Sequence, residues 1–158
     1  MSNRIRMCLA LKKQEISETW NARNISKEDI RILGSLMLNA YKGTIDYDGE
    51  SIEDAISEIK ATLNGKYGPF MEKCSFLMEE SQKGISAIIV TWFDELKKPL
   101  LAFSMTHQEY KNQGFGTYLL KKSINALLDE DYHELYLVVT DGNMPALHLY
   151  EKMGFQKT

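Results

Sequence analysis

The sequence predicts a mixed α/β fold of the α+β kind, in which a mostly antiparallel sheet carries helices on its faces. The expected order of elements is strand, two helices, three strands, helix, strand and helix. Short polar connections between the three consecutive strands indicate antiparallel hairpins. The strand–helix–strand unit from Leu100 to Val139 indicates one parallel crossover. A length of 158 residues fits one domain, which we expect over residues 20–158, after an N-terminal extension over residues 1–19.

The N-terminal extension favours no single structure. Its apolar residues alternate with others from Ile5 to Leu11, which is the period of a strand. The polar run Lys12–Glu15 that follows is more typical of a helix. The structure of residues 1–19 therefore stays open, and a short strand is expected after it, over Trp20–Ile25.

Capping boxes predict the first two helices. Ser26 is followed three positions later by Asp29, and Ser51 is followed in the same way by Asp54. In such a box each of the two side chains satisfies a backbone N–H group that the start of a helix leaves free. The expected ends of these helices are Gly43 and Gly65.

The rest of the chain is expected to form strands and helices in turn. Strands are predicted over Cys74–Met78, Ile85–Phe93, Leu100–Thr106 and Leu135–Val139, and a helix over Gly114–Asp129. A last helix has Pro145 in its first turn, where the missing N–H group costs nothing, and ends at Gly154.

Composition and charge argue against several classes of protein. Hydrophobic residues make up 44% and charged residues 26%, the balance of an ordinary globular protein. A net charge of −3 disfavours a general nucleic-acid binder. The two cysteines, Cys8 and Cys74, lie far apart, which excludes a disulfide scaffold and predicts no metal site. The apolar run Met7–Leu11 is too short for a signal peptide or a membrane helix, so we expect a cytoplasmic protein without a membrane partner.

The stretch Tyr110–Tyr118 leaves a strand and opens a helix. Gly114 and Gly116 carry no Cβ and let the backbone approach a ligand closely. The first N–H groups of a helix have no internal partner, and the helix dipole there favours negative charge, so such a turn can hold a phosphate or pyrophosphate. The bare Gly-x-Gly pattern is more often only a tight turn. The stretch is not a P-loop, and Leu119 breaks the dinucleotide-binding pattern Gly-x-Gly-x-x-Gly.

A second stretch, Asp141–Phe155, makes the pattern specific. Together the two stretches resemble the GNAT superfamily of acyl-CoA N-acyltransferases. The cofactor motif of that family is Gln/Arg-x-x-Gly-x-Gly/Ala, and Lys111-x-x-Gly114-x-Gly116 matches it except at the first residue. The following motif is Asn-x-x-Ala-x-x-Leu-Tyr-x-x-x-Gly-Phe, and it is matched by Asn143, Ala146, Leu149, Tyr150, Gly154 and Phe155. The resemblance is tight over about residues 100–155, and over residues 20–99 only the order of elements matches.

The resemblance implies that acetyl-CoA lies between the strands that end at Thr106 and Val139, which splay apart in this family. Backbone N–H groups of residues 112–117 would bind the pyrophosphate, and an N–H group at residues 105–106 would polarise the thioester carbonyl. Asn143 would contact the pantetheine arm. The implied cofactor-binding residues are Met105, Thr106, Lys111, Asn112, Gln113, Gly114, Phe115, Gly116, Thr117, Asn143 and Tyr150.

The resemblance also implies that Tyr150 is catalytic. A phenol, with an ordinary pKa of about 10, can donate a hydrogen bond or a proton to the departing thiolate. The alternative is a core aromatic, because Tyr150 lies on the apolar stripe of the last helix. No motif marks the base that deprotonates the acceptor amine. His107 is the first candidate because the strand delivers it to the cofactor turn, and Glu109 is the second; a hydrogen-bonded surface residue is the alternative for His107.

Two features depart from the family pattern. Lys111 stands where the family has Gln or Arg. A site that binds phosphate mainly through backbone N–H groups can tolerate this change, and Lys111 still places a positive charge nearby. The chain stops at Thr158, soon after the Gly-Phe pair, where the family usually adds a last strand. That strand is therefore short, missing or supplied otherwise.

The segment Thr44–Ile59 is strongly acidic. It carries Asp46, Asp48, Glu50, Glu53, Asp54 and Glu58 and no basic residue. In the GNAT superfamily the loop between the first two helices often borders the acceptor, and acidic residues there would attract a cationic amine. Acidic residues are also favoured at any helix start, which is the simpler interpretation.

We therefore predict an N-acetyltransferase that uses acetyl-CoA, needs no metal, and transfers the acetyl group to a primary amine. Direct attack of the amine is expected because no activated Ser or Cys is visible. The expected acceptor is a small molecule or a peptide rather than nucleic acid, and the expected assembly is a monomer or homodimer. The alternative is a non-catalytic CoA-binding or protein-interaction domain on the same fold.

Overall fold

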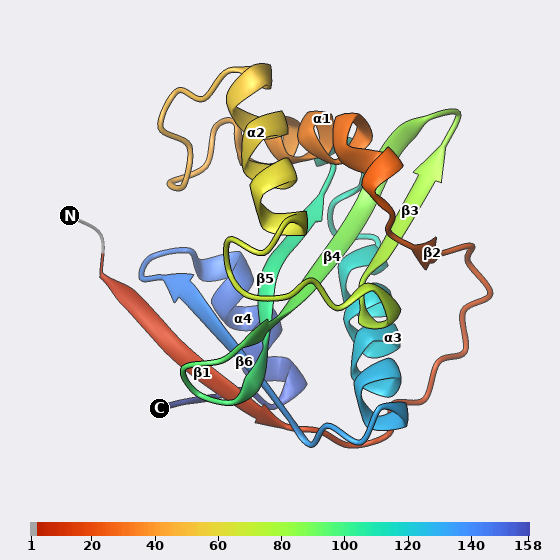
Figure 1. Ribbon diagram of the computed structural model, residues 1–158, viewed down its shortest axis with the longest axis vertical. Coiled ribbons are helices and arrows are strands. Elements are labelled where there is room, and N and C mark those ends of the chain that lie inside the picture. The colour runs from red at the N-terminus through yellow and green to blue at the C-terminus, as the bar shows by residue number, and fades with distance from the viewer. Residues whose placement is uncertain (1–2) are drawn as a thin grey trace.

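The computed structural model describes residues 3–158, which form a seven-stranded sheet with helices on both faces (Figure 1). The strands are β1 (Arg4–Ala10), β2 (Arg23–Asn24), β3 (Phe76–Glu80), β4 (Lys83–Phe93), β5 (Lys98–Thr106), β6 (Glu134–Thr140) and β7 (Gln156–Lys157). Their order across the sheet is β2-β3-β4-β5-β6-β1-β7. Neighbouring strands are antiparallel except β5 and β6, which are parallel. The predicted fold class is confirmed.

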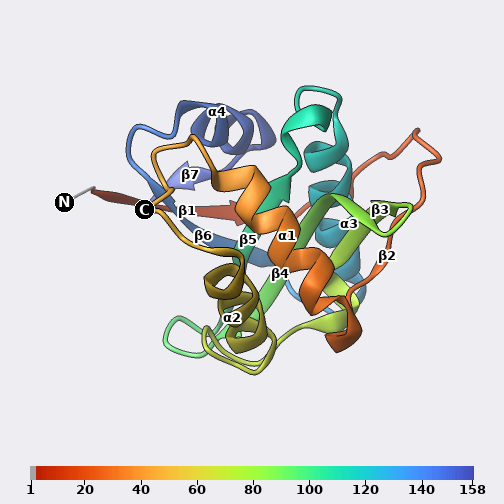
Figure 2. The same ribbon diagram turned by 90° about the horizontal axis from the view of Figure 1, so that it is seen from above.

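Helices α1 (Ile30–Tyr41) and α2 (Ile52–Leu63) cover one face of the sheet, and α3 (Phe115–Asp129) and α4 (Met144–Met153) cover the other (Figure 2). Single 3₁₀ turns occur at η1 (Lys27–Asp29), η2 (Glu72–Cys74) and η3 (Gln108–Tyr110). Strand β4 supplies both cores, because side chains alternate between the two faces of a strand. Ala87 and Ile89 pack with α1 and α2, whereas Ile88 and Val90 pack with α3 and α4.

The N-terminal segment, whose structure the sequence leaves open, contributes β1 to the sheet. β1 pairs antiparallel with β6 along its whole length, and Met7 and Leu9 are buried in the core. The last strand after Phe155 is short: β7 pairs with β1 at two positions, Met7 with Lys157 and Cys8 with Gln156. Strand β1 therefore occupies the place next to β6, and β7 lies at the edge of the sheet.

Residues 11–22 connect β1 to β2 without regular secondary structure, so the helical character of Lys12–Glu15 is not realised. Side-chain contacts with α3 hold the segment instead. Asn125 Oδ1 accepts a hydrogen bond from the Gln14 N–H group at 2.8 Å, and Tyr118 Oη donates to Trp20 O at 2.6 Å. The strand expected over Trp20–Ile25 is reduced to the two residues of β2.

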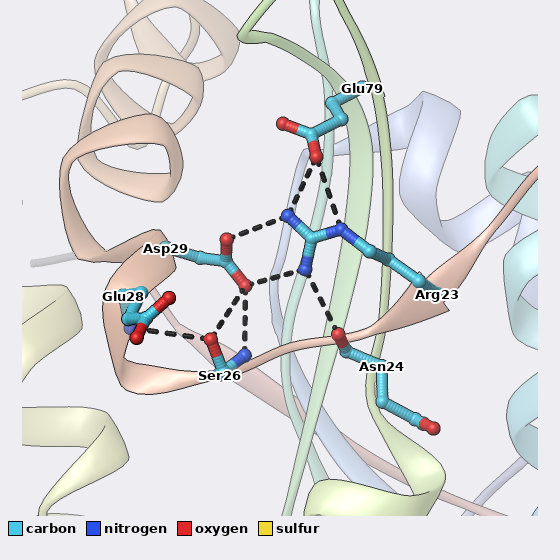
Figure 3. A network of polar contacts seen from close by, with 6 residues as sticks. All are labelled: Arg23, Asn24, Ser26, Glu28, Asp29 and Glu79. Atoms are coloured by element: carbon cyan, nitrogen blue, oxygen red, sulfur yellow. Dashed lines mark hydrogen bonds and ion pairs between the residues drawn. The ribbon is translucent and has the colours of Figure 1, made fainter.

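Both predicted capping boxes are present. Ser26 and Asp29 cap the 3₁₀ turn η1, which continues into α1, and Ser51 and Asp54 cap α2. Asp29 has a second role, because its carboxylate accepts hydrogen bonds from Arg23 Nη1 at 2.9 Å and from Nη2 at 2.7 Å (Figure 3). Arg23 also pairs with Glu79 at 2.7 Å. This network ties β2 to β3 and to the start of α1.

Candidate active site

The parallel strands β5 and β6 separate toward their carboxyl ends (Figure 1). They pair at one position, Leu100 with Tyr136. Just beyond this position β5 carries an extra residue, Ala102, because Ile89 of β4 pairs with Phe103 whereas Val90 pairs with Leu101. A β-bulge bends its strand and increases the local twist. We attribute the separation of β5 from β6 to this bend.

A cavity of about 600 Å³, here called the cofactor cavity, lies at the separated ends. It is bordered by the end of β5, the loop and first turn of α3, the start of α4 and the loop after α1. The predicted cofactor-binding residues lie here with the exception of Gln113: Met105, Thr106, Lys111, Asn112, Gly114, Phe115, Gly116, Thr117, Asn143 and Tyr150. Gln113 is exposed, and its side-chain amide donates to Glu109 O at 3.3 Å.

Backbone N–H groups at the start of α3 fit an anion. Gly114 is the N-cap residue and has φ +88°, a left-handed conformation that favours glycine. The first helical hydrogen bond runs from the Tyr118 N–H group to Gly114 O. Within residues 3–158, the N–H groups of residues 115–117 donate to no other backbone or side-chain group. These donors and the dipole of α3 suit a phosphate or pyrophosphate group.

Tyr150 lies in α4 with only 9% of its surface exposed, and it borders the cofactor cavity. Its ring packs against Phe155, with 5.5 Å between ring centroids. Burial raises the pKa of the Tyr150 phenol to about 12, although the Ser104 side chain lowers it in part. The phenol therefore stays protonated at any physiological pH.

Asn143 is committed to contacts within the protein. It is the N-cap residue of α4, where its Oδ1 accepts a hydrogen bond from the Ala146 N–H group at 3.4 Å. Its Nδ2 donates to Asp46 Oδ2 at 3.3 Å. The other Asp46 oxygen accepts from Thr140 Oγ1 at 2.7 Å. Asp46 thus joins the loop after α1 to the end of β6 and the start of α4.

A second cavity of about 680 Å³, here called the acceptor cavity, lies under α1 and α2. Its walls are the loop between these helices, α2, the face of β5 and β6, and β1. The aromatic lining residues are Tyr41, Tyr47, Tyr67, Phe93, Phe103 and Tyr136, and the acidic ones are Asp46, Glu50, Asp54 and Glu58. Tyr41 and Asp46 border both cavities, so the two cavities meet at these residues.

Asp46 and Tyr41 are the site residues that sequence reasoning did not single out. Asp46 appeared only as one of six acidic residues in its segment, and no motif marked Tyr41. Burial raises the pKa of the Tyr41 phenol, and Tyr150 and Asp46 contribute in the same direction. Both residues line both cavities and therefore lie at their junction.

His107 does not lie at either of these cavities. It borders a separate groove formed by α1 and the β3–β4 hairpin, together with Arg31, Asn39 and Gly84. Its Nδ1 accepts a hydrogen bond from the Glu109 N–H group at 3.1 Å and caps the turn η3. Glu109 is exposed and pairs with Lys83 at 3.5 Å. His107 and Glu109, which the sequence suggests as the general base, therefore do not line the cofactor cavity.

The sequence model of the acetyltransferase (GNAT) family matches residues 48–155, which is more than half of the chain. The chain belongs to the GNAT acetyltransferase family. The match includes both motifs and the residues of the α3 turn. Within the described residues 3–158, no group of three or more His, Cys, Asp or Glu side chains is arranged to hold a metal ion, and no helix is long and apolar enough to cross a membrane.

Curated relatives of this GNAT chain match over a short region. N-alpha-acetyltransferase 30 of Xenopus laevis is 36% identical over 59 residues, which cover 37% of this chain and 22% of the relative. An N-alpha-acetyltransferase of Saccharolobus solfataricus is 41% identical over 51 residues, which cover 32% of this chain and 30% of the relative. The chain thus spans less than a third of the length of these relatives.

Solved structures share the GNAT fold at low identity. A GCN5-related N-acetyltransferase from Sphaerobacter thermophilus gives a TM-score of 0.73 at 15% identity, over 99% of this chain and 49% of the other. The ribosomal-protein-S18-alanine N-acetyltransferase of Escherichia coli gives 0.66 at 20% identity, over 87% and 78%. A Clostridium acetobutylicum protein, described as a predicted acetyltransferase with acetyl-CoA, gives 0.64 at 20% identity, over 87% and 90%.

Proposed function

We propose that this GNAT protein transfers an acetyl group from acetyl-CoA to a primary amine, with the donor in the cofactor cavity and the amine in the acceptor cavity. The observation that carries the proposal is that the two cavities meet at Tyr41 and Asp46. Tyr150 borders the donor side of the same region. Two ligands bound in these cavities would therefore be neighbours, as a direct attack requires.

The donor side binds through backbone groups. The N–H groups of residues 115–117 hold the pyrophosphate, and Lys111 adds a cation at the same edge of the cavity. The backbone of Met105 and Thr106, beyond the β5 bulge, runs beside the pantetheine arm. Acetyl-CoA supplies an activated thioester, whose carbonyl the amine attacks. A backbone N–H group of residues 105–106 stabilises the negative charge that develops on the carbonyl oxygen.

Tyr150 stabilises the departing sulfur. Its phenol has a pKa of about 12, whereas a thiol has an ordinary pKa of about 8.5. Complete proton transfer from a phenol with this raised pKa to the less basic thiolate is therefore unfavourable. Tyr150 therefore acts by donating a charge-assisted hydrogen bond from Oη to the thiolate, which is stronger than a neutral hydrogen bond.

Asp46 orients the incoming amine. Its carboxylate borders both cavities and accepts one hydrogen bond at each oxygen, from Thr140 and Asn143. A carboxylate offers about four acceptor positions, so lone pairs remain for an ammonium group or for a water that carries its proton away. We therefore assign the removal of the amine proton to Asp46 rather than to His107.

The acceptor is proposed to be the α-amino group of a polypeptide. The curated relatives carry the name N-alpha-acetyltransferase, and one structural neighbour is named for the alanine of a ribosomal protein. The acceptor cavity is large enough for several side chains and is lined by aromatic rings that would pack against them.

Acetylation of a peptide panel by the purified protein tests the proposal. Tyr150→Phe should lower kcat by roughly 10²–10⁴ while the affinity for acetyl-CoA stays unchanged, because the phenol acts on the departing group. An unchanged kcat would contradict the role of Tyr150. If acetyl-CoA raises the melting temperature but no amine is acetylated, the protein is a CoA-binding domain and the proposed activity is wrong.

A further inference from the structure

The acceptor cavity carries two arginines on the wall that β1 provides. Arg4 and Arg6 line it, and both are exposed. The ion pairs formed among residues 3–158 involve other residues, and neither guanidinium takes part in a hydrogen bond to a described residue. Both guanidinium groups are therefore free to bind a ligand in this cavity, as far as the described residues 3–158 are concerned.

The acidic residues of the same cavity are in the opposite situation, because each has a partner within the protein. Asp54 closes the capping box of α2, and Glu58 binds Lys66 at 2.7 Å and the Tyr67 hydroxyl at 2.9 Å. Glu50 accepts a hydrogen bond from the Asp48 N–H group at 3.0 Å, and Asp46 accepts from Thr140 and Asn143. Among the charged residues that line the cavity, the two arginines are therefore the ones whose side chains have no hydrogen-bond or ion-pair partner among residues 3–158.

The pairing of β1 with β6 fixes where these charges lie. Arg4 is opposite Thr140 and Arg6 is opposite Val138, and directly opposite side chains share one face of an antiparallel pair. Thr140 donates to Asp46, so Arg4 lies beside the junction of the two cavities. Arg6 is two residues further along the strand, about 7 Å from Arg4. The two arginines therefore extend from the junction into the acceptor cavity.

We propose that the acceptor carries a carboxylate besides its amine, and that Arg4 and Arg6 bind this carboxylate. The proposal rests on the proposed function, which places the amine at the junction. The planar guanidinium fork matches a carboxylate with two parallel hydrogen bonds. An extended peptide advances about 3.3 Å per residue, so a spacing of about 7 Å corresponds to two residues. The substrate is a polypeptide whose second or third residue is acidic.

Matched acceptor peptides test this assignment. Peptides that differ only by Glu or Gln at the third position, and a second pair that differs at the second position, are assayed with acetyl-CoA. The wild-type protein should prefer the Glu peptide of at least one pair by tenfold or more in kcat/KM, because a charge-assisted pair is lost in the Gln peptide. The double variant Arg4→Gln/Arg6→Gln should lose this preference. Equal rates for Glu and Gln in both pairs would overturn the proposal.

Arg31→Gln is the control variant. Arg31 is also an exposed arginine, but it lies on α1 beside the separate groove that contains His107. This variant should keep the full preference for the Glu peptide. If Arg31→Gln reduces the preference as much as the double variant does, the effect comes from the overall charge of the protein, and the proposed carboxylate site is wrong.

A binding measurement separates this inference from the proposed function. The N-acetylated Glu and Gln peptides are titrated into the protein by calorimetry in the presence of coenzyme A, which requires no turnover. Suppose that the N-acetylated Glu peptide binds more tightly than the Gln peptide, that Arg4→Gln/Arg6→Gln removes this difference, and that the free peptides are not acetylated in the assay. This result would refute the proposed activity and support the carboxylate site. Equal affinity for the two peptides would overturn the site even if acetylation is observed. Free glutamate is assayed in parallel, and its turnover without turnover of the peptides would refute the polypeptide substrate.

Discussion

Replacing Asp29 by asparagine should destabilise the protein by breaking the network that joins β2, β3 and α1. The Asp29 side chain is only 6% exposed and binds both terminal nitrogens of Arg23, at 2.7 and 2.9 Å. It also accepts a hydrogen bond from the Ser26 N–H group at 2.8 Å. Asparagine can keep the bond to Ser26, but it loses the negative charge and offers an amide group to Arg23.

The size of the loss follows from the burial of the two partners. Removing one partner of a fully buried pair costs about 3–5 kcal/mol. The Arg23 side chain is 46% exposed and keeps Glu79, so the cost here is smaller, about 2–3 kcal/mol. In a domain of this size 1 kcal/mol corresponds to roughly 2–4 °C, so the melting temperature should fall by roughly 5–10 °C.

The chain contains a matched control for this experiment. Asp54 occupies the same position in the second capping box and accepts a hydrogen bond from the Ser51 N–H group at 2.9 Å, but no arginine binds it. Urea and thermal unfolding of Asp29→Asn and Asp54→Asn compare the two. Asp29→Asn should show the larger loss of stability. Equal losses would refute the reasoning, because they would assign the whole effect to helix capping.

The pH dependence of stability gives an independent check. The Arg23 side chain, together with the Ser26 backbone, holds the pKa of Asp29 below its ordinary value, although burial acts in the opposite direction. A lowered pKa in the folded state stabilises the protein above the unfolded-state pKa of about 4, and this contribution is lost as the pH falls further. The difference in unfolding free energy between wild type and Asp29→Asn should therefore shrink below about pH 4.

Three further outcomes are expected. Acetyl-CoA at 100 times its Kd should stabilise the wild type by about 2.7 kcal/mol, which corresponds to a rise of roughly 5–10 °C in melting temperature. Gly114→Asp should abolish this rise, because the new carboxylate repels the pyrophosphate. Met7→Ala should cost about 2–5 kcal/mol in urea unfolding, because Met7 is fully buried. Because the pKa of Tyr150 is about 12, kcat should not fall between about pH 8 and 10 through ionisation of this group; a fall that Tyr150→Phe removes would contradict the burial argument.

The sequence predicts elements well where local chemistry and periodicity agree. Both capping boxes, the helices α1–α4 and the strands β3–β6 appear in the structure at or near their expected ranges. The helical character of Lys12–Glu15 and most of the strand expected over Trp20–Ile25 are not realised. Trp20 packs its ring on Phe115 and Tyr118 of α3, with centroid distances of 4.6 and 5.2 Å, so this contact rather than a strand determines its place.

Long-range pairing was the part that the sequence could not predict. The alternation from Ile5 to Leu11 has the period of a strand, but its partner β6 lies at the other end of the chain. The position of Asp46 at the junction depends in the same way on its hydrogen bond with Thr140, which is 94 residues away in sequence. His107 follows β5 directly, yet its N–H group continues the ladder to Ile85 O at 2.8 Å and its side chain borders the groove beside α1.

The two faces of β1 contribute to different properties: one face packs in the core and contributes to stability, and the other faces the acceptor cavity and is proposed to determine the acceptor preference. Met7 points into the core, whereas Arg4 and Arg6 line the acceptor cavity, because neighbouring side chains of a strand point to opposite faces. Met7→Ala should therefore lower the melting temperature and keep the preference for Glu over Gln peptides at temperatures where the variant is folded. Arg4→Gln/Arg6→Gln should lose the preference with a change in melting temperature of no more than a few degrees, because both side chains are exposed. Loss of the preference in Met7→Ala would mean that any disturbance of β1 alters the acceptor cavity, and the arginines would then have no special role.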